Sequence, residues 1–215
     1  MPPPTTDDRP LTTMDGIVSR HVNRRLSRPL AAGLAHTPVT PNGATWFTLA
    51  FSLGMGALVA VGQHVAGGIG IQLASIIDGV DGDLARLTGR TSRFGAALDA
   101  IADRYADAAI LGGMTVYAAR FEDWPNAAVV GALALAGSLT VSYSRARAEA
   151  EGVWPIGGVG GWAGAALGML ATRDVRLLVA AAGTAAGYCY WTLVVLGVAS
   201  GVTVAVRLVR GRWGG

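Results

Sequence analysis

Residues 78–103 decide the fold and the chemistry of this chain. They begin Asp78-Gly-Val-Asp81-Gly82-Asp83-Leu-Ala85-Arg86 and continue, after eight residues, with Gly95, Asp99 and Asp103 at steps of four. The stretch lies in a strongly apolar sequence, where charged side chains are costly and mark functional positions. If both parts are helical, Asp78 and Asp81 share one side of the first helix, and Asp99 and Asp103 share one side of the second.

Two helices would thus present two carboxylates each, beside small residues. Four carboxylates that face one another repel strongly unless cations hold them together. Hard oxygen ligands favour Mg²⁺, Mn²⁺ or Ca²⁺ over Zn²⁺. We therefore predict a site in which paired divalent ions clamp a diphosphate during an in-line displacement. Asp83 faces the opposite side of the helix from Asp81 and is not counted as a ligand.

The neighbouring motif residues suit the same chemistry. Gly82, Ala85 and Gly95 leave room for a ligand close to the helix backbones. Arg86 offers a fork of donors to phosphate oxygens, and one carboxylate at the end of the array can take a proton from an attacking hydroxyl. Two alternatives remain open at this point: Asp–Arg pairs that only join helices, and a pathway for cations or protons.

The composition indicates an integral membrane protein of one domain. Of the 215 residues, 52% are hydrophobic and only 14% are charged, whereas about a quarter of a soluble domain is charged. All 17 basic residues are arginines. They gather at the predicted membrane edges, so the net charge gives no reason to expect a nucleic-acid partner. The single Cys189 excludes an intrachain disulfide.

The chain is expected to have three parts. Residues 1–14 are rich in Pro, Thr and Asp and have no signal-peptide core, so we expect a disordered tail. Residues 15–38 are expected to form an amphipathic helix in the membrane interface and a turn, because apolar residues recur on one side and arginines on the other. Residues 39–215 would form an all-α domain of six transmembrane helices.

The expected spans are residues 43–61, 65–87, 94–118, 127–147 and two short spans within 174–207 that reverse near 187–191. One long span with a surface extension is the alternative for the last pair. Residues 152–171 are read as an interfacial or re-entrant connection. Arginines cluster on one side of this arrangement, and the other side has only Arg120. The positive-inside rule then places both termini and the acidic motif on the cytoplasmic side of the cell (inner) membrane.

The spacing Asp78-x-x-Asp81-Gly82-x-x-Ala85-Arg86-x8-Gly95-x3-Asp99-x3-Asp103 resembles the complete signature of the CDP-alcohol phosphotransferase family. Members are six-helix membrane enzymes, usually homodimers, that move a substituted phosphate from a CDP-linked donor to an alcohol and release CMP. The resemblance implies two metal ions, Mg²⁺ or Mn²⁺, bound by Asp78, Asp81, Asp99 and Asp103. It also implies that Asp103 is the general base. The implied donor site comprises Asp78, Asp81, Gly82, Ala85, Arg86, Gly95 and Asn42.

Further stretches resemble the transferase domain of di-myo-inositol-phosphate phosphate synthases and the related phosphatidylinositol-phosphate synthases. They include residues 15–25, 37–42, 73–78, 103–107, 143–149 and 173–176. This resemblance implies an acceptor-phosphate pocket of Arg145, Arg147, Arg173 and Arg176, for which positive-inside anchoring is the alternative explanation. Asp107 either binds acceptor hydroxyls, supports Asp103, or pairs with Arg104 or another arginine.

The expected reaction therefore joins a CDP-inositol-like donor to a phosphorylated polyol such as an inositol phosphate. The first alternative is phospholipid synthesis from CDP-diacylglycerol. A divalent-cation transporter is less favoured, because the carboxylates crowd one end of the predicted helices. Many such synthases carry a fused cytidylyltransferase domain; we expect the donor here to be made elsewhere.

Overall fold

The structure is a computed structural model that describes residues 23–151 and 172–211. Every regular element in these two ranges is a helix. The helices are α1 (Arg24–Leu34), α2 (Pro41–Ala60), α3 (His64–Leu87), α4 (Arg93–Phe121), α5 (Ala127–Glu151), α7 (Arg173–Ala185) and α8 (Cys189–Gly211). The predicted tail, the first part of the predicted interfacial helix and the predicted connection at 152–171 lie outside the described residues.

All six segments predicted as spans are helical. Each helix begins and ends within a few residues of the predicted bounds. The chain reverses between α7 and α8 at residues 186–188, where Gly187 has a φ of +76° that suits glycine. The described residues after 172 thus form two helices, the 13-residue α7 and the longer α8, and the chain reverses near the predicted place.

Three helices are long and apolar enough to cross a bilayer, namely α2, α5 and residues Cys189–Val209 of α8. Helices α3 and α4 carry the aspartates, and α7 has only 13 residues. Large apolar side chains such as Trp46, Phe47 and Leu53 are exposed on the outside of α2. These features indicate a membrane protein.

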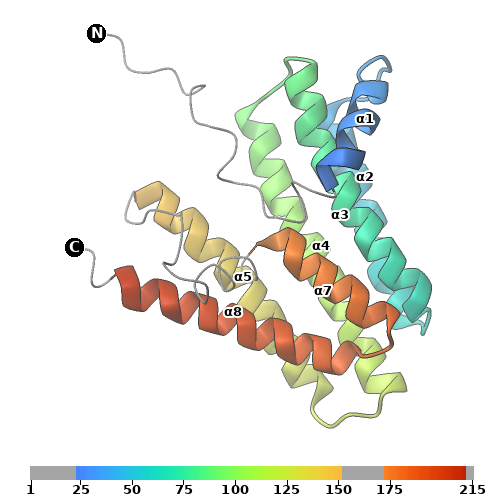
Figure 1. Ribbon diagram of the computed structural model, residues 1–215, viewed down its shortest axis with the longest axis vertical. Coiled ribbons are helices and arrows are strands. Elements are labelled where there is room, and N and C mark those ends of the chain that lie inside the picture. Colours follow the sequence, from blue (N-terminus) through green and yellow to red (C-terminus); the bar gives the residue numbers. More distant parts are fainter. Residues whose placement is uncertain (1–22, 152–171, 212–215) are drawn as a thin grey trace.

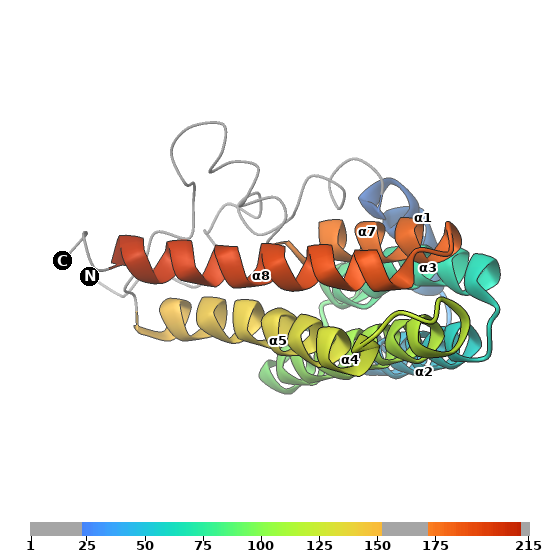
Figure 2. The ribbon, with the colours of Figure 1, turned by 90° about the horizontal axis from the view of Figure 1, so that it is seen from below.

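The helices form two layers. Figure 2 shows α7 and α8 on one side of the molecule and α2, α4 and α5 on the other. Helix α4 packs against α2 and α5, while α3 packs against α1, α2 and α7. Helix α7 therefore lies next to α3, which carries the first half of the acidic motif (Figure 1).

Glycine permits the close approach of α2 and α4. A Cβ on Gly113 would lie 2.1 Å from the carbonyl oxygen of Gly56, and a Cβ on Gly56 would lie 2.3 Å from that of Ala109. Backbone meets backbone at this crossing, so a larger residue at either glycine would force the helices apart. The crossing holds the second half of α4 against the second half of α2.

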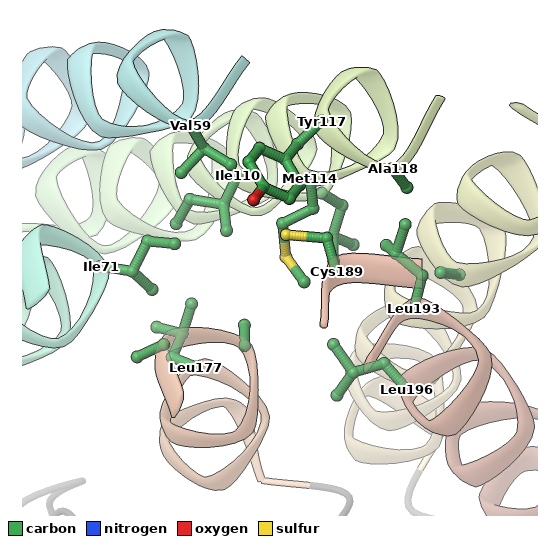
Figure 3. Packing of buried hydrophobic residues seen from close by; sticks show 14 of the residues in the cluster. Val59, Ile71, Ile110, Met114, Tyr117, Ala118, Leu177, Cys189, Leu193 and Leu196 are labelled. Atoms are coloured by element: carbon green, nitrogen blue, oxygen red, sulfur yellow. The ribbon is translucent and has the colours of Figure 1, made fainter. Parts of the chain in front are cut away.

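The main hydrophobic core fills the end of the α3–α4 pair that is remote from the acidic motif. Figure 3 shows side chains from five helices meeting there: Val59, Ile71, Ile110, Met114, Leu177, Leu193 and Leu196. The core uses the first half of α3 and the second half of α4. Because these helices run in opposite directions, the aspartate-bearing halves lie together at the opposite end.

Candidate active site

The hairpin between α3 and α4 brings the two halves of the acidic motif together. Gly89, with a φ of +65°, lies in the short connection. The Ser92 hydroxyl then caps α4 by accepting a hydrogen bond from the Gly95 amide at 2.9 Å. A Cβ on Gly95 would lie 3.2 Å from the Asn42 amide oxygen. Glycine at this motif position therefore lets the start of α4 lie against the start of α2.

Three of the four predicted metal ligands converge. One carboxylate oxygen from each of Asp78, Asp99 and Asp103 lies within 4.8 Å of the others. Like charges this close need a cation between them. Three hard oxygen donors on two rigid helices fit a divalent ion such as Mg²⁺ or Mn²⁺.

Asp81 is not part of this cluster, and both of its carboxylate oxygens accept hydrogen bonds. Its side chain is buried, and one oxygen accepts a hydrogen bond from the Thr45 hydroxyl on α2. Its other oxygen accepts a hydrogen bond from the Gly82 amide at 2.6 Å. Asp81 still lines the same cavity as the three converging aspartates.

Arg173, the first residue of α7, places its guanidinium among the carboxylates. Its Nη1 lies 2.5 Å from an Asp78 oxygen and 2.9 Å from an Asp103 oxygen. Its Nε donates a hydrogen bond to Asp107 at 3.1 Å. One arginine thus joins α3, α4 and α7 through three carboxylates.

Asp107 lies one turn beyond Asp103 and is buried. Besides Arg173, it accepts hydrogen bonds from the Ser138 hydroxyl at 2.9 Å and from Arg176 Nη2 at 3.2 Å. Of the roles considered for Asp107, the structure therefore shows pairing with arginines, namely Arg173 and Arg176 of α7. Arg104 instead contacts Asp103, at 3.4 Å.

A cavity of about 350 Å³ opens beside the three converging aspartates, a size typical of sites for small ligands. It is lined from α1, α3, α4, α5 and α7 and from residues 172–174. The predicted site residues in its wall are Asp78, Asp81, Gly82, Arg86, Asp99, Asp103, Arg145 and Arg173. The described residues Ala85, Gly95 and Asn42 are not in its wall. Asn42 and Gly95 adjoin each other at the neighbouring helix starts.

Helix α1 forms one wall of the cavity through small polar residues. Asn23 donates hydrogen bonds to the backbone oxygen and the hydroxyl of Ser75, at 3.2 and 3.1 Å. Ser27 donates to Asp83 at 3.0 Å. The other oxygen of Asp83 pairs with Arg86 at 2.6 Å. Asp83 thus fastens α1 and orients the motif arginine.

The two arginines predicted on α5 lie in different surroundings. Arg145 lines the cavity and pairs with Glu149 at 3.0 Å. Arg147 pairs with Glu151 at 2.6 Å, and its side chain is 64% exposed. Residues two apart on a helix face nearly opposite sides, so Arg145 and Arg147 point in different directions. Arg173 and Arg176, three apart, share one face and both contact Asp107.

Sequence reasoning missed several polar residues at the site, among them Asn23, Ser27, Thr45 and Ser138. Each holds a motif carboxylate or the helix that bears it. Only Thr45 had a usable signal, because it follows Asn42 by three residues and therefore shares its helix face.

Comparison with known proteins agrees with this geometry. A sequence model of the CDP-alcohol phosphatidyltransferase family matches residues 38–204. A bifunctional IPC transferase and DIPP synthase from Rubrobacter xylanophilus is 41% identical over 201 residues, which cover 92% of this chain and 44% of that protein. The chain thus spans less than half of that relative. A phosphatidylinositol phosphate synthase from Mycobacteroides abscessus is 36% identical over 205 residues, covering 91% of this chain and 87% of that protein.

The fold is also similar to that of solved structures. The crystal structure of Mycobacterium tuberculosis phosphatidylinositol phosphate synthase with CDP-DAG bound is similar with a TM-score of 0.71 and 28% identity, over 86% of this chain and 92% of that chain. The same enzyme in complex with manganese and citrate gives a TM-score of 0.72 and 29% identity, over 87% and 89%. This chain belongs to the CDP-alcohol phosphatidyltransferase family and is a transferase of phosphate-containing groups.

Proposed function

We propose that this protein transfers a substituted phosphate from a CDP-linked, CDP-inositol-like donor to a hydroxyl of an inositol-phosphate-like acceptor and releases CMP. The observation that carries the proposal is that the three converging aspartates line one cavity together with Arg173, which pairs with two of them, Asp78 and Asp103. The 41% identity to a bifunctional IPC transferase and DIPP synthase supports this choice of substrates.

Asp78, Asp99 and Asp103 would hold divalent metal, with Asp81 completing the set for two Mg²⁺ or Mn²⁺ ions. When bound, the metal would neutralise the diphosphate of the donor and the charge that develops on it. The manganese complex of the M. tuberculosis relative supports this assignment. Gly82 would leave room for the diphosphate, and Arg86 would bind its oxygens. Ala85, Gly95 and Asn42 would complete the donor site.

Asp103 is the proposed general base. It lies at the end of the array next to Arg173, where the acceptor would enter. In the proposed step its carboxylate takes the proton of the acceptor hydroxyl, whose oxygen forms a bond to the transferred phosphorus. The bond from that phosphorus to the CMP oxygen breaks, and CMP leaves with the electron pair.

The acceptor phosphate would lie against the arginines at the α7 side of the cavity. Arg145 and Arg173 line the cavity, and Arg176 supports Arg173 through their shared partner Asp107. Guanidinium groups bind phosphate through paired hydrogen bonds. Arg147 remains a weaker candidate because it pairs with Glu151 near the surface.

A second candidate is phospholipid synthesis from CDP-diacylglycerol with the same acceptor. It is favoured by the relative from M. abscessus, of whose length the chain covers 87%, and by the similarity to a structure with CDP-DAG bound. Both candidates use a phosphorylated inositol and differ in the donor.

For the membrane arrangement, we propose that α2, α3, α4, α5, α7 and α8 all cross the inner membrane. Helix α1 would lie in the interface, with the exposed Leu26 and Leu30 toward the lipid. The arginine distribution supports a cytoplasmic active site and cytoplasmic termini. A homodimer is proposed from the family resemblance. Cysteine accessibility at introduced surface positions and light scattering in detergent would test these points.

The deciding experiment incubates the purified protein with Mg²⁺ or Mn²⁺, inositol 1-phosphate and either CDP-inositol or CDP-diacylglycerol. CMP and the product are measured. CMP from CDP-inositol supports the first candidate, and CMP only from CDP-diacylglycerol supports the second. Absence of CMP from both donors, while wild-type protein remains folded, would overturn both.

A further inference from the structure

Arg173 contacts carboxylates that are proposed to hold the metal. Its Nη1 contacts both Asp78 and Asp103, which are two of the three converging aspartates. Mg²⁺ binds carboxylate oxygens at about 2.0–2.1 Å. A divalent ion held by Asp78, Asp99 and Asp103 would need carboxylate oxygens, and Nη1 already occupies one oxygen of Asp78 and one of Asp103.

The Nε atom of Arg173 is hydrogen-bonded to a residue outside this pair of carboxylates. Its Nε donates to Asp107, which lies outside the metal cluster. Asp107 is itself held from α5 by Ser138 and from α7 by Arg176. If Nη1 leaves Asp78 and Asp103, the Nε contact to this buried anchor keeps the arginine at the edge of the cavity.

We infer that Arg173 is a built-in cation that holds the aspartates together before metal binds and is exchanged for the metal when it does. Asp107 is the positioning residue that retains the displaced guanidinium. The inference rests on the proposed metal site and deepens it. Only after displacement does Nη1 become available to a phosphate, so the metal gates anion binding.

The exchange predicts a specific change in metal affinity. Arg173→Gln removes the competitor, so Mn²⁺ should bind about tenfold tighter or more, because two close ion pairs no longer have to break. Binding is measured from the electron paramagnetic resonance signal of free Mn²⁺ and does not depend on turnover. Thermal unfolding in EDTA should show Arg173→Gln less stable than wild type, and Mn²⁺ should stabilise the variant more than wild type.

Arg176→Gln is the matched control for charge alone. It removes the same charge from the same helix and also loses a contact to Asp107, but Arg176 pairs with none of the three converging aspartates. Its Mn²⁺ affinity should change much less than that of Arg173→Gln. Equal tightening in both variants would show a through-space effect of charge and would overturn the exchange.

Arg173→Lys tests the inference if the glutamine variant fails to fold. Lysine keeps the charge but cannot donate from two separate nitrogens, so Mn²⁺ affinity should lie between wild type and Arg173→Gln. Unchanged affinity in both Arg173 variants would overturn the exchange while leaving the metal site intact. If wild-type protein binds no Mn²⁺, the proposed metal site fails instead, and the two failures are thereby distinguished.

The gating of anions has its own readout. Inositol 1-phosphate binding to wild type, measured by calorimetry, should strengthen about tenfold or more when Mn²⁺ is present. In Arg173→Gln this coupling should be lost. Equal acceptor binding with and without Mn²⁺ in wild type would contradict the gating.

Discussion

Thr45 and Asp81 are joined across the α2–α3 interface by a hydrogen bond from the threonine hydroxyl to the motif carboxylate. Both side chains are buried. This contact engages one oxygen of Asp81, which is not among the three converging aspartates. The orientation of one motif residue therefore depends on a helix that carries none of the motif aspartates.

Thr45→Val should impair the enzyme by leaving a buried carboxylate oxygen without its donor. We expect a loss of about 1–3 kcal/mol in stability and a higher KM for the CDP donor. Thermal unfolding and initial rates measure the two effects. Thr45→Ser keeps the hydroxyl and should restore most of both; failure of serine to rescue would contradict the hydrogen-bond explanation.

Asp103→Asn should nearly abolish turnover, with a fall of about 10²-fold to 10⁴-fold in kcat, because an amide cannot accept the proton. Binding of the CDP donor, measured by calorimetry with Mg²⁺, should change far less. Near-normal turnover in this variant would show that another group is the base.

Arg145→Ala should raise the KM for the phosphorylated acceptor by about tenfold or more, the effect of losing a charge-assisted hydrogen bond. Arg147→Ala is its natural comparison, because it lies two residues away and faces outward toward Glu151. Its KM should stay within about twofold of wild type. Equal effects of both variants on the acceptor KM would contradict the proposed acceptor pocket.

Gly113→Ala should destabilise the α2–α4 crossing by about 1–3 kcal/mol, because the added methyl would meet the Gly56 backbone. The neighbouring Gly112→Ala is the control, since a Cβ there has nothing within 4 Å. Thermal unfolding in detergent should rank Gly113→Ala well below both wild type and Gly112→Ala. Similar melting temperatures for the two variants would mean that the helices separate without cost.

The sequence predicted the helices and a set of four facing aspartates because their signals are local, and the structure brings three of the four together. Long apolar runs and steps of three and four residues follow directly from helix geometry. The pairing of Arg173 with Asp78 joins residues 95 apart in the chain, and no local spacing encodes it. Thr45 and Ser138 are single hydroxyls in apolar helices, and only the packing gives them their partners. The outward direction of Arg147 could have been predicted, because Arg145 and Arg147 are two apart on a helix and cannot face the same cavity.

The pairing of Arg173 on α7 with aspartates of α3 and α4 also affects how the protein is made. Chains emerge from the ribosome with the N-terminal part first, so the acidic hairpin of α3 and α4 is synthesised well before α7. During that interval Asp78 and Asp103 lack the arginine that later neutralises them. The acidic site is completed only when α7 arrives, and biogenesis of the mature protein depends on its C-terminal helices as well as on the motif.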